Sequence, residues 1–100
     1  MTSRRVQEII ALYRAYFREH NVDKLILPGD EINDSGAAEH ARLITLGHCY
    51  KMLDHIEILV EHSWPARREE AIRLLSFVQG CLWSLGIFCQ DEIEHHNRVR

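Results

Sequence analysis

Between Arg73 and Asp91 the chain reads LLSFVQGCLWSLGIFCQ (residues 74–90), seventeen residues without a formal charge. A surface helix of a soluble protein shows a charged face, and wrapped at about 3.6 residues per turn this stretch shows none. Its apolar residues cover nearly the whole cylinder, so the helix must be covered on all sides. Because two other short helices cannot easily enclose it, we expect a second copy of the chain to complete the core.

Small residues recur on one side of this stretch. Ser76, Gly80 and Ser84 are four residues apart, which places them on one helix face where another backbone can approach closely. A glycine within a helix costs about 1 kcal/mol relative to alanine, so Gly80 and Gly86 indicate a packing reason. We predict a packing face of Ser76, Gly80, Trp83 and Ser84. The pattern does not decide whether the neighbouring helix belongs to the same chain.

Composition and net charge limit the classes of protein to which this chain can belong. The chain has 100 residues, 46% hydrophobic and 27% charged, which is typical of one folded soluble domain. The net charge of −3 argues against binding to duplex nucleic acid through many phosphate contacts. The uncharged run is too short and too polar to span a bilayer, and residues 1–8 lead into a helix rather than a signal peptide. We therefore expect a cytoplasmic protein with no membrane partner.

Hydrophobic periodicity predicts a first helix over about residues 3–20, whose apolar residues repeat at three-and-four spacing. Residues 21–34 follow as a connector, in which Pro28 and Gly29 mark a turn. The connector is long and unusually apolar for a link between helices. We expect it to lie against the bundle as an ordered strap.

Two longer helices are predicted over about residues 36–63 and 65–96, separated by a break at Pro65. Proline suits the first helical turn because its missing N–H would be unpaired there. Since almost nothing joins these helices, they must form an antiparallel hairpin. The expected fold is an all-α single domain over residues 1–100, with an N-terminal amphipathic helix, an apolar connector and a long helical hairpin, assembled as a homo-oligomeric bundle.

The tip of the hairpin is the candidate ligand-binding site. Trp64 precedes the helix start, and Arg67 and Arg68 fall in its first turn. Free backbone N–H groups at a helix N-terminus attract anions, two guanidinium groups would strengthen that attraction, and Trp64 could stack on a base. The alternative is that these arginines form surface ion pairs with nearby glutamates, which contribute little free energy.

His48, His55 and His62 lie seven residues apart in the second predicted helix. Residues at that spacing share one side of a helix but are roughly 10 Å apart, too far for two of them to bind one metal ion. We interpret them as a solvated flank beside the apolar seam. A pH-sensitive interface is the alternative, because histidine titrates near neutral pH.

One Glu-x-x-His motif, Glu92 to His95, lies near the end of the third predicted helix. Di-iron carboxylate sites in four-helix bundles use two such motifs and two further glutamates. Because only one motif is present, we predict no metal site and no cofactor. The sequence also contains no nucleophile elbow and no glycine-rich phosphate loop, so we do not expect an enzyme.

Pro65, Arg68-Glu69, Ala71-Ile72, Gly80 and Trp83 follow one another in a pattern that resembles the helical hairpin of anti-CBASS and anti-Thoeris sponges. These phage proteins sequester cyclic-oligonucleotide immune signals. The resemblance covers about a fifth of the chain. It implies a non-enzymatic oligomer, often hexameric, that traps nucleotide ligands between its subunits, and Arg68 is the one ligand residue that carries over.

A second likeness concerns the segment FVQGCLWSLGI (residues 77–87) and the segment DEIEHHNR (residues 91–98). Both are similar to parts of a group of short phage and prophage proteins of unassigned role, and the likeness extends weakly to residues 6–14. It implies a phage origin, and a phage-encoded protein would act in the cytoplasm of the host cell.

Together these patterns predict a non-catalytic, phage-type accessory protein that acts by binding. The sharpest candidate ligand is a small cyclic nucleotide immune signal, held by a homo-oligomer that works as an anti-defence sponge. The first alternative is a helical inhibitor or adaptor that binds a host protein. The second alternative is a metal-dependent helical enzyme that uses Glu92 and His95.

Overall fold

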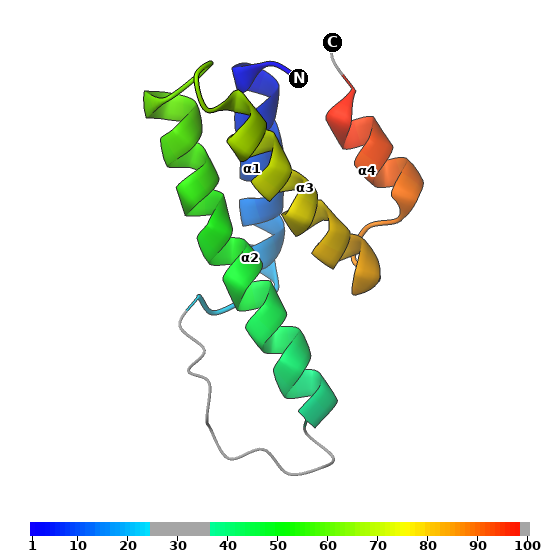
Figure 1. The fold of residues 1–100 in the computed structure, drawn as a ribbon. Helices are drawn as coiled ribbons and strands as arrows, with labels where there is room; N and C mark the ends of the chain where they lie inside the picture. Colours follow the sequence, from blue (N-terminus) through cyan, green and yellow to red (C-terminus); the bar gives the residue numbers. More distant parts are fainter. Residues whose placement is uncertain (25–36, 99–100) are drawn as a thin grey trace.

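The computed structural model describes residues 1–24 and 37–98, and all regular structure in that part of the chain is helical (Figure 1). The all-α fold predicted from the sequence is confirmed. The described helices are, in chain order, α1 (Ser3–Glu19), α2 (Ala37–His62), α3 (Arg68–Ser84) and α4 (Gln90–Asn97). Residues 25–34, on which the predicted strap falls, lie outside the described residues.

α1 begins at a capped N-terminus and presents one apolar stripe to the core. The hydroxyl oxygen of Thr2 accepts a hydrogen bond from the backbone N–H of Arg5 at 3.1 Å, which pairs a donor that the first helical turn would otherwise leave free. The stripe expected from three-and-four spacing is buried, and it consists of Val6, Ile9, Ile10, Tyr13 and Phe17.

α2 packs against both α1 and α3. α2 and α3 run in opposite directions and are joined by residues 63–67 (Figure 1). Each fully buried Leu, Ile or Val side chain stabilises the fold by roughly 1.5–3 kcal/mol, so this seam is a large part of the core. Its buried residues are Leu46, Cys49, Leu53, Ile56, Leu59 and Val60 of α2, with Ala71, Leu75, Val78 and Leu82 of α3.

The single helix expected over residues 65–96 is wrong, because the structure has two helices in this range. α3 begins at Arg68, after a turn over residues 63–67, and ends at Ser84. α4 begins at Gln90 and contacts α1 and α3. Figure 1 shows that the chain reverses after α3, so that α4 runs back beside it.

The physical reason for this break is Gly86. Its φ is 73°, in the left-handed region that glycine adopts without steric cost. The backbone N–H of Gly86 donates to the carbonyl oxygen of Trp83 at 3.0 Å, and the N–H of Ile87 donates to that of Leu82 at 2.9 Å. These two hydrogen bonds form a Schellman motif, which ends a helix and pairs its last carbonyl groups. Gly86 is therefore a helix stop and not part of the packing face of α3.

We predict that Gly86→Ala lowers the free energy of unfolding by about 1 kcal/mol, because an L-residue at this φ brings its Cβ too close to the following carbonyl oxygen. Gly86→Asn should lose less, because asparagine enters the left-handed region more readily. Urea denaturation followed by circular dichroism measures both values. A Gly86→Ala variant as stable as the parent protein would contradict the assignment of Gly86 as the residue that ends α3.

Candidate binding surface

Five residues of α3 form an exposed surface, which we call the open face: Ser76, Phe77, Gly80, Trp83 and Ser84. The rings of Phe77 and Trp83 are each 58% exposed. The opposite side of α3 is buried in the core. α3 is therefore apolar on both sides, and the described residues cover it on only one of them.

Gly80 lies at the centre of the open face, and the described part of the chain leaves it free of close neighbours. A Cβ atom added at Gly80 would meet no heavy atom within 4 Å. The hydroxyl of Ser76 donates to the carbonyl oxygen of Ile72 at 2.9 Å, within the same helix. The predicted face is thus present and exposed, and the close packing expected on it is not made by the described residues of the same chain.

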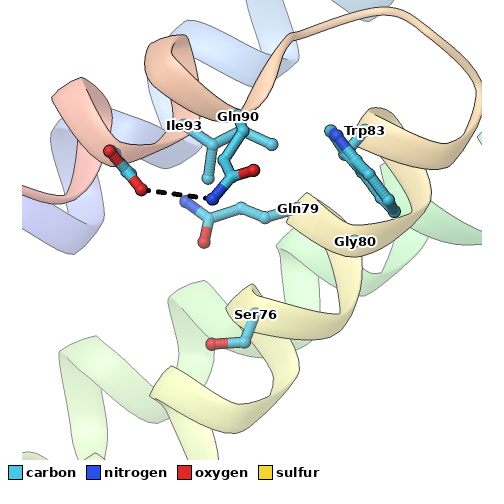
Figure 2. Close-up of a pocket in the computed structure, with 7 residues that line it drawn as sticks. Ser76, Gln79, Gly80, Trp83, Gln90 and Ile93 are labelled. Atoms are coloured by element: carbon cyan, nitrogen blue, oxygen red, sulfur yellow. Dashed lines mark hydrogen bonds between the residues drawn. The ribbon is translucent and has the colours of Figure 1, made fainter.

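A hollow of about 390 Å³ lies between α3 and α4 on one side of the open face, and we call it the α4 hollow (Figure 2). The groups around it include an indole ring, two amides and a carboxylate, and none of the described residues that line it is cationic. These groups suit an apolar or neutral polar partner better than a phosphate. The lining residues are Ser76, Gln79, Gly80 and Trp83 of α3, with Gln90, Ile93 and Glu94 of α4.

A second hollow, of about 350 Å³, lies on the other side of the open face, and we call it the α2 hollow. Its lining is mainly apolar, and no charged residue is among the described residues that form it. It is formed by Thr45 of α2, by Phe77, Gly80, Cys81 and Ser84 of α3, and by Leu85. Gly80 is shared by both hollows, so the open face is a low ridge with a depression on each side.

A buried hydrogen-bond network connects α4 to α1 and α3. The hydroxyl of Tyr13 lies 2.9 Å from Nδ1 of His96, and Nε2 of Gln79 donates to the same hydroxyl oxygen at 3.1 Å. The amides of Gln79 and Asn97 also exchange two hydrogen bonds, at 2.6 and 3.1 Å. Buried polar groups require such partners, so the network fixes the position of α4 as a wall of the α4 hollow.

Arg5 and Phe88 hold α4 from two further directions. The guanidinium group of Arg5 donates to the carbonyl oxygens of His96 at 2.6 Å and of His95 at 3.3 Å, where the end of a helix carries partial negative charge. The ring of Phe88 lies 5.5 Å from that of Tyr13 and 5.0 Å from that of His96, between ring centroids. These contacts place α1, α4 and the chain between α3 and α4 in one cluster.

The network favours a neutral His96. Gln79 donates to the oxygen of Tyr13, and the neutral tautomer of His96 that carries its proton on Nε2 can accept the single hydroxyl proton of Tyr13 at Nδ1. Burial lowers the pKa of His96 below its ordinary value of 6.5, against the opposing charge of Glu92. Burial raises the pKa of Tyr13 to about 12, so the phenol keeps its proton.

The predicted tip residues Trp64, Arg67 and Arg68 lie together at the start of α3. The Cζ atom of Arg68 is 6.0 Å from the centroid of the Trp64 ring, and Nη1 of Arg67 is 2.9 Å from a carboxylate oxygen of Glu70. The backbone N–H of Arg67 donates to the carbonyl oxygen of Ser63 at 2.7 Å. One arginine is therefore paired with a carboxylate, and the other lies over an aromatic ring.

All three histidines of the predicted flank are exposed, but they do not share one environment. His48 and His55 line a hollow of about 510 Å³ along α2, which we call the histidine groove. Its other lining residues are Lys51, Met52, Asp54 and Ile58 of α2 and Leu74 of α3. His62 lies apart from it, with Nε2 3.8 Å from a carboxylate oxygen of the exposed Glu61.

Within residues 1–24 and 37–98, no three Cys, His, Asp or Glu side chains are grouped so that they would hold a metal ion. Glu92 has a local partner instead, because its Oε1 accepts a hydrogen bond from the backbone N–H of Cys89 at 3.0 Å. That hydrogen bond lowers the pKa of the Glu92 carboxyl group. Glu92 therefore caps the N-terminus of α4, while His95 lies exposed in its last turn.

The hydrogen-bond network that holds α4 beside the open face is not evident from the sequence. Periodicity places Tyr13 in an apolar stripe and gives no role to His96 or Asn97. Gln79 carries the one usable signal, because it is an amide that falls on the same side of the uncharged run as the buried Leu75 and Leu82. A buried amide needs a hydrogen-bond partner, but the sequence does not identify that partner.

The fold defines an all-α protein with a partly uncovered third helix, and no helix in the described part of the chain is long and apolar enough to cross a membrane. Comparison with protein-family models, with curated proteins and with solved structures finds no match. The likenesses to the sponges and to short phage proteins therefore stay predictions from sequence patterns.

We predict that the free energy of unfolding falls as the pH is lowered from about 7.5 to about 5, and that His96→Gln makes this fall shallower. Because folding lowers the pKa of His96, the unfolded chain binds more protons in this range, and acid favours unfolding. The carboxyl groups whose pKa is lowered by folding, such as Glu57, change the free energy of unfolding mainly below this pH range.

Urea denaturation at a series of pH values measures the effect. His62→Gln is the matched control, because it removes an exposed histidine of α2 that lies outside the network. It should keep the pH dependence of the parent protein. An unchanged pH dependence in His96→Gln would contradict the assigned protonation state.

Proposed function

We propose that the protein acts by binding rather than by catalysis and that its working form is a homo-oligomer. One observation carries this proposal: α3 is apolar on both sides, and its open face leaves the rings of Phe77 and Trp83 58% exposed. Transfer of apolar surface out of water contributes about 25 cal/mol per Å², and exposed apolar patches commonly mark interaction sites. Association of copies through this face supplies cover that residues 1–24 and 37–98 of one chain do not provide.

We propose that the ligand is a small anionic nucleotide signal and that the protein is a phage-type accessory protein. The tip of the hairpin supports the ligand proposal, because Arg68 and Trp64 combine a guanidinium group with an aromatic ring. Guanidinium groups bind phosphates, and aromatic rings stack on bases. In this proposal the oligomer sequesters the nucleotide without altering it, as the resemblance to the sponges implies.

We predict that the parent protein is an oligomer at micromolar concentration and that Phe77→Ala and Trp83→Ala each weaken association by about tenfold or more, as expected for aromatic residues at the centre of an interface. Ile58→Ala is the matched control, because Ile58 is 56% exposed but lies in the histidine groove of α2. It should leave association unchanged. Sedimentation velocity and native mass spectrometry measure the distribution of species. A folded parent protein that stays monomeric would contradict the proposal.

We predict that cyclic nucleotides raise the melting temperature of the protein and that Arg67→Ala/Arg68→Ala removes this shift, because the double variant lacks both guanidinium groups of the tip. Arg4→Ala, which removes a well-exposed arginine of α1, is the control and should keep the shift. Denaturation of the loaded protein should release the nucleotide intact. Persistence of the shift in the double variant would remove the tip from the proposal, and recovery of a hydrolysed nucleotide would contradict binding without catalysis.

A helical inhibitor or adaptor of a host protein is the second candidate. The histidine groove favours it, because the exposed Ile58 lies there among polar and charged side chains such as Lys51 and Asp54, a mixed surface away from the open face that suits a protein partner. This candidate predicts no thermal shift with nucleotides. It also predicts that a captured host protein is lost in Ile58→Asp and retained in Trp83→Ala.

A further inference from the structure

The exposed residues of α3 are arranged symmetrically about Gly80. Ser76 and Ser84 stand four residues to either side of it, and Phe77 and Trp83 stand three residues to either side. At about 100° and 1.5 Å per residue, Ser76 and Trp83 fall on one side of Gly80, and Phe77 and Ser84 fall on the other. The two hollows agree with this division, because the first pair lines the α4 hollow and the second pair lines the α2 hollow.

We propose that a second copy of this chain binds the open face as an antiparallel α3–α3 pair, with a two-fold axis passing beside Gly80. This inference rests on the proposed oligomer and specifies its geometry. An isologous interface brings the same surface of both copies together, so the surface must complement itself. The symmetric order of small and large residues about Gly80 meets that requirement.

Helix geometry gives the pairing. In an antiparallel pair centred on Gly80, a residue that follows Gly80 by three positions lies level with residues that precede it by three or four positions in the partner. The two-fold axis keeps each residue on its own side of the interface. Trp83 then lies over the partner's Ser76, and Phe77 lies over the partner's Ser84. Each aromatic ring faces a serine, and the two glycines face each other.

The hollows have a place in this arrangement. Trp83 of one copy enters the α4 hollow of the other beside Ser76, and Phe77 enters the α2 hollow beside Ser84. The α4 hollow has a volume of about 390 Å³, within the range of about 300–1,000 Å³ typical of clefts that receive small molecules. Standard interfaces bury about 800 Å² on each partner, and the hollow walls formed by α4 and α2 enlarge the contact beyond the two helices toward that size.

Arg73 determines the direction of the pair. It is exposed and lies seven residues before Gly80, nearly two full turns, so it falls close to the centre line of the open face. A parallel pair would place Arg73 beside the partner's Arg73, where the like charges repel. An antiparallel pair instead places it near the C-terminal end of the partner's α3, which carries partial negative charge. α3 has no basic residue in its own last turn, but Arg42 of α2 already donates to the carbonyl oxygen of Leu85 at that end, at 3.0 Å. The repulsion between like charges in a parallel pair is therefore the main argument for the antiparallel direction.

Cysteine cross-linking tests this geometry. Ser76→Cys and Ser84→Cys are prepared separately in a Cys89→Ser background, which removes the exposed native thiol, and the two proteins are mixed and oxidised mildly. The antiparallel pair places position 76 of one copy level with position 84 of the other. We expect the mixed 76–84 disulfide to form at least about tenfold faster than either homodimer disulfide, with each linkage identified by peptide mass spectrometry.

The other outcomes separate this inference from the proposed function. Preferential 76–76 and 84–84 disulfides would show a parallel pair and overturn the inference while the oligomer stands. An oligomer that forms no disulfide at either position would place the interface elsewhere and also overturn it. A parent protein that stays monomeric would overturn both the antiparallel pair and the proposed homo-oligomer. As a second test, Gly80→Leu should stay folded, because a Cβ meets open space there, and should be monomeric; a Gly80→Leu protein that still dimerises would contradict the pairing.

Discussion

At Gly86 the backbone turns into the left-handed region, and hydrogen bonds from Gly86 and Ile87 back to α3 end that helix. The rest of the binding surface depends on this turn. Because α3 stops there, the chain reverses and α4 returns along the α3 flank, where it forms one wall of the α4 hollow. A helix continuing past residue 86 would carry the α4 residues away from Tyr13 and leave the amide of Gln79 without Asn97, one of its two partners.

α4 is short and polar, so its stability comes from tertiary contacts rather than from helix propensity. An isolated helix of 8 residues is not stable in water, because nucleation is costly and few hydrogen bonds follow it. Glu92 caps the first turn of α4, and Arg5 donates to a carbonyl oxygen in the last turn of α4. The hydrogen bond between Tyr13 and His96 holds α4 against α1. Each of these groups is satisfied inside the described structure, which makes α4 a fixed wall of the surface.

The open face of α3, which the described residues leave uncovered, is mainly apolar and shallow. Its small and large residues are arranged symmetrically in the sequence about Gly80. The cationic groups of the hairpin tip, Arg67 and Arg68, lie at the opposite end of α3 from the turn at Gly86. Two surfaces are therefore separated along α3. The aromatic and small residues of the open face suit another copy of the chain, and the guanidinium groups of the tip suit an anion. In the proposed homo-oligomer, pairing through the open face leaves the guanidinium groups of the tip exposed for the proposed ligand.

Periodicity and turn chemistry determined the helical class, the apolar stripe of α1, the break near Pro65 and the shared face of Ser76, Gly80 and Trp83, because these follow from local spacing along the chain. The end of α3 was also encoded locally, in Gly86. However, the sequence around a glycine looks the same whether the glycine permits close packing or ends the helix. Only the tertiary structure showed that Gly86 ends the helix. It alone brought Tyr13, Gln79 and His96 together, because hydrogen bonds between residues distant in sequence depend on how whole helices pack.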